Sequence, residues 1–144
     1  ENPLEDLLAD CDLTTPKGQA EAIRRTITRE ADLLFDREMP VWHSRVAFQV
    51  LQYAGSLRDT LRSIVIDREH EQVARLLRAI DPDMDEATVV LNFMLFFSPI
   101  LFHADYQNPI LQRLGTAEYS RDYLQRLVDA CSEQILLRFN LPLE

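Results

Sequence analysis

The sequence predicts an all-α fold, a single-domain helical bundle of five or six main helices. Three observations predict it. Apolar residues recur at spacings of three and four along several segments, and no stretch shows the alternation of a half-buried strand. The segments begin at proline or capping residues and end at glycine or proline, as helices do. With only three glycines in 144 residues, few positions suit hairpin turns. The length suits one domain, 1–144.

Two helices are expected in the first quarter of the chain. Asn2-Pro3 supplies a capping residue and a first-turn proline for a short helix within residues 3–10, which can lie at the periphery of the bundle. Thr15-Pro16 repeats this signal, and the helix that follows should run to about Glu38. Its apolar residues fall on one side, which predicts that this side faces the core.

A third helix and a long rod are expected next. The third helix should cover Val41–Ala54 and end at Gly55, a residue that favours helix C-termini. Ser56 then caps a long helix that closes at Pro82. Six consecutive polar residues, 67–72, interrupt its apolar pattern. The rod should therefore project beyond the core there, or bend.

The most unusual segment is the almost unbroken apolar run at residues 89–102, VVLNFMLFFSPILF. The run is too short and too interrupted to span a bilayer, which needs about 20 apolar residues. Asp83 and Glu86 form a capping box before it, and Pro99 must kink or break the helix. A helix that is apolar all round is buried on every side. It should therefore lie in the middle of the bundle or against a second subunit.

The C-terminal part predicts two more helices and a dimer interface. Asn108-Pro109 opens a short turn of helix that ends at Gly115, and Ser120 caps the last long helix. We expect the apolar run and the stripe of this last helix to form a homodimer interface, because both need covering. The candidate interface residues are Phe96, Leu124, Leu127, Val128, Cys131 and Ile135.

Charge and cysteine content limit the partners. A net charge of −9 opposes phosphate binding, so the chain alone should be a poor DNA binder. The first residues lack the basic start and apolar stretch of a signal sequence. Cys11 and Cys131 are isolated and are expected to be reduced. These features predict a cytoplasmic protein with no membrane partner.

Signatures of enzymes and cofactors are nearly absent. His70-Glu71 begins the zinc-protease pattern His-Glu-x-x-His, but Ala74 stands where the second histidine should be. The polar stretch around His70 is therefore interpreted as a solvated patch. His43 and His103 fall on other predicted helices. Neither a glycine-rich phosphate loop nor a Gly-x-Ser-x-Gly motif occurs. We expect no catalytic site, no metal and no cofactor.

Aromatic residues gather in two segments, with a few polar side chains among them. This combination is typical of a cavity for a small molecule, although a well-packed core with satisfied polar groups would look the same. The candidate ligand-binding residues are Trp42, Phe48, Gln49, Asn92, Phe93, Phe97 and His103.

Three stretches carry a resemblance to a known family. They are Met39–Arg45 (MPVWHSR), Leu95–His103 (LFFSPILFH) and Pro109–Gly115 (PILQRLG), the last followed by Glu118-Tyr119-Ser120 and the final amphipathic helix. In this order they resemble the C-terminal regulatory domain of tetracycline-repressor (TetR) family transcription regulators. The resemblance covers roughly Pro16–Phe139.

The resemblance implies an effector bound inside the bundle and homodimerisation through the last two long helices. It also implies DNA binding by an N-terminal helix-turn-helix, which we expect to lie outside this sequence. The expected function is thus a ligand-sensing and dimerising domain that binds an apolar or aromatic small molecule and modulates DNA binding. The alternative is a helical protein–protein adaptor without a ligand cavity. An enzyme would need converging titratable groups that the sequence does not show.

Overall fold

The computed structural model describes residues 4–35, 49–50 and 52–144 of the chain. All regular secondary structure in these residues is helical, which confirms the all-α prediction. Most of the helix expected over Val41–Ala54 lies outside the described residues.

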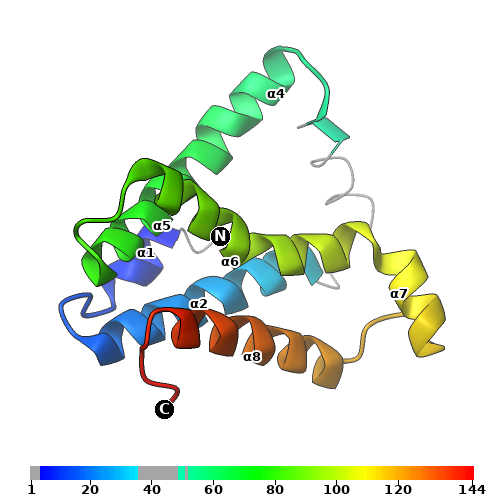
Figure 1. The fold of residues 1–144 in the computed structure, drawn as a ribbon. Coiled ribbons are helices and arrows are strands. Elements are labelled where there is room, and N and C mark those ends of the chain that lie inside the picture. Colours follow the sequence, from blue (N-terminus) through cyan, green and yellow to red (C-terminus); the bar gives the residue numbers. More distant parts are fainter. Residues whose placement is uncertain (1–3, 36–48, 51) are drawn as a thin grey trace.

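Helix α1 packs against α2 at one end of the molecule, and α2 runs from there toward the middle (Figure 1). Helix α1 covers Leu4–Ala9 and α2 covers Pro16–Phe35, and the residues between Phe35 and the expected end at Glu38 lie outside the described residues. Helix α1 contacts both α2 and α5, and its leucines belong to the main core. The N-terminal helix is therefore a part of the core rather than a peripheral element.

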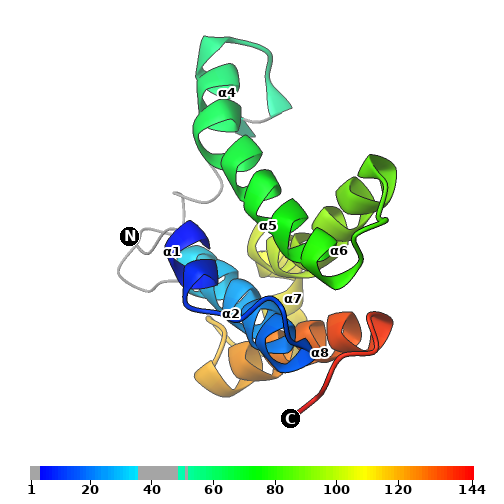
Figure 2. The same cartoon turned by 90° about the vertical axis from the view of Figure 1, so that its left-hand side faces the viewer.

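A long rod, which projects away from the other helices, follows (Figures 1 and 2). It consists of α4 (Ser56–Leu61), a π-helical turn η1 (Arg62–Ile66) and α5 (Asp67–Ile80). Neither α4 nor η1 buries a residue, whereas α5 buries four apolar side chains. The start differs from the prediction: Gly55 is the N-cap, Ser56 is the first helical residue, and no side chain caps the helix.

Helix α6 covers Glu86–Asp105 and contains the apolar run. Its N-cap is Asp85, whose carboxylate accepts a hydrogen bond from the backbone N–H of Thr88 at 2.7 Å. The expected capping box at Asp83 and Glu86 is therefore wrong by two residues. Helix α6 also continues unbroken through Pro99, so the proline does not end it.

The last two helices begin and end close to where the sequence predicts. Helix α7 covers Gln107–Leu114 and ends at Gly115, whose φ of 70° lies in the left-handed region that favours glycine. Helix α8 covers Arg121–Arg138, and the Ser120 hydroxyl accepts from the backbone N–H of Tyr123 at 3.1 Å. The cap at Ser120 and the stop at Gly115 are confirmed.

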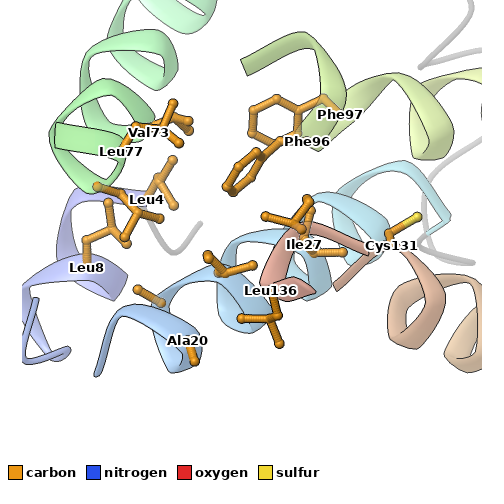
Figure 3. Close-up of a cluster of buried hydrophobic side chains, with 14 of the residues drawn as sticks. Leu4, Leu8, Ala20, Ile27, Val73, Leu77, Phe96, Phe97, Cys131 and Leu136 are labelled. Atoms are coloured by element: carbon orange, nitrogen blue, oxygen red, sulfur yellow. The ribbon is translucent and has the colours of Figure 1, made fainter. Parts of the chain in front are cut away.

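Helix α2 is central, because α5, α6 and α8 all pack against it. Helices α6 and α8 lie side by side on one side of α2 (Figures 1 and 2). In the core, Phe96 and Phe97 of α6 point toward Val73 of α5 and Ile27 of α2 (Figure 3). Burying a large apolar side chain stabilises the fold by roughly 1.5–3 kcal/mol, so this cluster is the main source of stability.

Candidate functional site

Most of the residues expected at a dimer interface lie inside the chain's own core. Phe96 is 1% exposed, Val128 8%, Cys131 6% and Ile135 5%. Helix α2 packs along α8 and covers the buried part of its stripe. Leu124 and Leu127 are half-buried. Helix α2 thus covers most of the apolar surface that the sequence predicts a second subunit to cover.

The opposite side of α6 remains uncovered. Five large apolar side chains at helical spacing, between 44% and 57% exposed, form what we call the outer apolar face: Val90, Leu91, Met94, Leu95 and Phe102. The ring of Tyr106 stacks on Phe102, with centroids 4.9 Å apart. Helix α6 is therefore apolar on both sides, with only one side buried. This exposed apolar surface makes the outer apolar face a candidate interaction site.

Phe93 and Phe97 form an aromatic cluster between α5 and α6. Their ring centroids are 4.9 Å apart, and the imidazole of His70 packs edge-on against Phe93 at 5.1 Å. Phe97 is buried and Phe93 is half-buried. His70 Nε2 is buried and makes no hydrogen bond within the described part of the chain, although the Glu86 carboxylate lies 3.9 Å away. The cluster thus combines two packed aromatic rings with a polar ring atom.

The interpretation of His70 as part of a solvated patch is wrong, because its ring packs against Phe93 and its Nε2 is buried. The sequence spacing could have indicated that His70 faces the core. His70 lies three residues before Val73 and seven before Leu77, and it therefore falls on the same side of the helix as these two buried residues.

Asn92 lies on a different side of α6, toward α8. Its amide nitrogen donates to the Thr88 carbonyl at 2.8 Å, and its amide oxygen accepts from Nε of Arg138 at 2.8 Å. Asn92 is 1% exposed. Because both ends of the amide are bonded within the chain, Asn92 ties α6 to the end of α8 rather than to the aromatic cluster.

His103 also faces α8. Its Nδ1 is 2.7 Å from the Pro99 carbonyl, which can only accept, so Nδ1 carries the proton. In the neutral ring, Nε2 then accepts from the Tyr123 hydroxyl at 3.1 Å. The Tyr119 hydroxyl donates to the His103 carbonyl at 2.8 Å, and burial raises the pKa of Tyr119 to about 12. This network joins the end of α6 to the start of α8.

A nearly buried carboxyl lies on α2. Glu30 is 9% exposed, and burial, helped by the charge of Glu69, raises the pKa of its side chain to about 7. The neighbouring Arg29 opposes this shift and pairs with Glu69 at 2.9 Å. The sequence contained the signal: Glu30 follows Ile27 by three residues and therefore falls on the buried side of α2.

The structure does not bring all the expected ligand-binding residues together. Phe93 and Phe97 lie together, whereas Asn92 and His103 face α8. Gln49 is exposed. Trp42 and Phe48 lie outside the described residues.

An open hollow of ≈ 420 Å³ lies on the surface of α8, away from the aromatic cluster. Over residues 4–35, 49–50 and 52–144, no group of three or more histidine, cysteine or acidic side chains is placed to hold a metal ion.

By length and composition, α6 could cross a membrane. Helix α6 is 20 residues long and is therefore longer than the apolar run that it contains. In the described part of the chain it is the single helix that is long and apolar enough to cross a membrane. The expectation that the run is too short therefore does not apply to the whole helix. One side of α6 nevertheless packs into the core.

Comparison with protein-family models, curated proteins and solved structures found no match to this chain. The assignment of a function therefore rests on the residues and the geometry described above.

Proposed function

We propose that this chain is the ligand-sensing and homodimerising domain of a TetR-like transcription regulator. The observation that carries the proposal is α6, which packs one apolar side into the core and leaves the other uncovered. The order of helices and motifs that resembles the regulatory domains of this family supports the same function. DNA would be bound by an N-terminal helix-turn-helix outside this sequence.

The outer apolar face suits self-association. A two-fold interface places the same patch of two copies together, so an apolar surface is covered without any other partner. The residues of this face expose roughly 480 Å² per copy, or about 950 Å² for a pair, which is below the roughly 1,200 Å² of a stable interface, so the interface must extend beyond this face. Helix α8 lies beside α6 and enlarges the surface available to a second copy.

The effector site is proposed at the aromatic cluster between α5 and α6. An apolar or aromatic ligand would pack against Phe93 and Phe97, and Nε2 of His70, which makes no hydrogen bond in the described part of the chain, would orient it. Because α6 carries both this cluster and the outer apolar face, a ligand that favours one arrangement of α5 and α6 would change the geometry of the dimer. The spacing of two attached DNA-binding domains would change with it.

A thermal-shift screen against hydrophobic small molecules tests the sensing role. A ligand at 100 times its Kd stabilises a protein by about 2.7 kcal/mol, which raises the Tm of a domain of this size by several degrees. The shift should be lost in Phe93→Ala and kept in Phe102→Ala, a matched truncation on the outer apolar face. Equal shifts in both variants would place the ligand elsewhere, and a lack of any stabilising compound would argue against the sensing role.

A helical protein–protein adaptor is the second candidate, and the outer apolar face also favours it. An adaptor would expose this face in a stable monomer and cover it with a different protein. The two functions differ in the free chain, since only the first predicts a dimer.

A further inference from the structure

The side of α2 that faces α5 carries a polar residue at each end. Four buried residues lie along this line of the helix, at spacings of four, three and four: Gln19, Ile23, Thr26 and Glu30. Near the start of α2, the side-chain amide of Gln19 donates to the Ala79 carbonyl, in the last turn of α5, at 2.9 Å. The first polar end of the line thus holds the end of α5.

The other end of the contact meets the start of α5. Arg29 pairs with Glu69, in the first turn of α5, with Nη1 and Oε1 2.9 Å apart. Both side chains are only 17% exposed. The Gln19–Ala79 hydrogen bond and this ion pair show that α2 and α5 run antiparallel. The Gln19 end is joined by a neutral hydrogen bond, whereas the Glu69 end depends on charge.

Glu30 lies at this charged end without a partner of its own. Its side chain is 9% exposed and makes no hydrogen bond or ion pair with another described residue. In the described part of the chain, the charges that act on it are those of Glu69 on α5 and Arg29 on α2. Helices α1, α6 and α8 meet α2 through the apolar core. A buried carboxyl without a partner is stable only when protonated, so ionisation requires water to reach it.

We propose that α5 pivots about its Gln19-bonded end when Glu30 ionises. The start of α5 then separates from α2, water hydrates the carboxylate, and repulsion between Glu30 and Glu69 is relieved. The rod that leads into α5 swings outward with it. Neither α4 nor η1 buries a residue, and both project away from the other helices, so no packing opposes this swing (Figure 2).

The rod amplifies a small opening. Glu69 lies ten residues from Ala79, and Leu57 lies 22 residues from it. At about 1.5 Å per residue, these positions are about 15 Å and 33 Å from the pivot. Admitting one layer of water at Glu69 takes about 3 Å, because a hydrogen bond to water has this length. The end of the rod at Leu57 should therefore move by roughly 6 Å.

His70 is the other titratable group at this end of α5, and the test must separate it from Glu30. Its ring packs on Phe93, and its Nε2 lies 3.9 Å from the Glu86 carboxylate. A protonated His70 would attract Glu86 and hold α5 against α6 at low pH. The pivot does not depend on the proposed sensing or self-association.

Double electron–electron resonance measures the swing directly. Spin labels at Leu57→Cys on the rod and Thr28→Cys on α2 occupy exposed positions. Cys11→Ser and Cys131→Ala leave these two as the labelled sites, and dilution with unlabelled protein restricts the distances to one chain. At pH 8 a distance longer than that at pH 5 should appear. The pKa of Glu30 is about 7 when buried and 4.5 when hydrated, so the ratio of opened to closed chains should rise about 70-fold between these pH values.

Three variants identify the group responsible. Glu30→Gln cannot ionise and should keep the short distance at both pH values. In Glu69→Gln, Arg29 is free to pair with Glu30, so the ratio should level off at a lower pH than in the wild type. Glu71→Gln, at an exposed position of α5, is the matched control and should behave like the wild type. Circular dichroism verifies that each variant is folded.

Two results would overturn the proposal. If the wild type gives the same distance distribution at pH 5 and pH 8, α5 does not pivot. If Glu30→Gln shows the same lengthening as the wild type, another group, such as His70, controls the motion.

Discussion

Replacing Glu30 with glutamine should change how stability depends on pH. Burial raises the pKa of Glu30 from 4.5 to about 7, so the folded state holds the proton more tightly than the unfolded state. The stability that this proton provides is fully present below pH about 4.5 and is lost as the pH rises through about 7. The free energy of unfolding should fall by about 2.5 kcal/mol between pH 5 and pH 8 through this group.

Glu30→Gln removes the titration and keeps the shape of the side chain. The variant should match the wild type at low pH, and its advantage in free energy of unfolding should grow by about 2.5 kcal/mol between pH 5 and pH 8. Urea denaturation at fixed protein concentration, followed by circular dichroism at several pH values, would measure the difference. Glu71→Gln, at an exposed position of α5, is the control and should keep the pH dependence of the wild type. Parallel curves for the wild type and Glu30→Gln would refute the assignment of a raised pKa to burial.

Three further predictions concern the core, a helix cap and DNA. Phe96→Ala should lower the free energy of unfolding by about 3–5 kcal/mol, because it opens a cavity in the core. Phe102→Ala, on the outer apolar face, should lower it by under about 1 kcal/mol in the free subunit. Urea denaturation of dilute protein would measure both changes. Ser120→Ala should cost about 1 kcal/mol by removing the cap of α8, whereas Ser120→Asp should retain most of it, and the same denaturation assay measures both. The chain alone should not bind labelled duplex DNA even at low salt, because a charge of −9 opposes phosphate contacts; tight binding with a steep salt dependence would contradict this.

The helices could be predicted because their signals are local. Pro16, Gly115 and Ser120 act within one helical turn, through a fixed φ, a left-handed φ and a side-chain cap, so the residue type alone identifies the position. The N-cap of α6 was misplaced because Asp83 and Asp85 are both competent caps. Only the structure shows which backbone N–H each carboxylate reaches.

The candidate site could be predicted only in part, because it depends on which side of α6 meets which helix. When a helix is apolar on all sides, the spacing of its apolar residues does not show which side is buried. The sequence alone therefore could not assign Phe96 to the core or to a partner. Asn92 and Phe93 are neighbours in sequence, yet they lie about 100° apart around the helix and meet α8 and α5 respectively. The role of His70 depends on a contact with Phe93, 23 residues away.

The molar mass of the free chain tests the central claim most directly. Size exclusion with light scattering at tens of micromolar should give twice the subunit mass of 16.7 kDa for the wild type. Leu91→Asp, which places a charge on the outer apolar face, should give a folded monomer, and Leu143→Asp, an equal change on the exposed C-terminal tail, should remain dimeric. A wild-type mass of 16.7 kDa under these conditions would contradict the account, as would a Leu91→Asp variant that dimerises like the wild type.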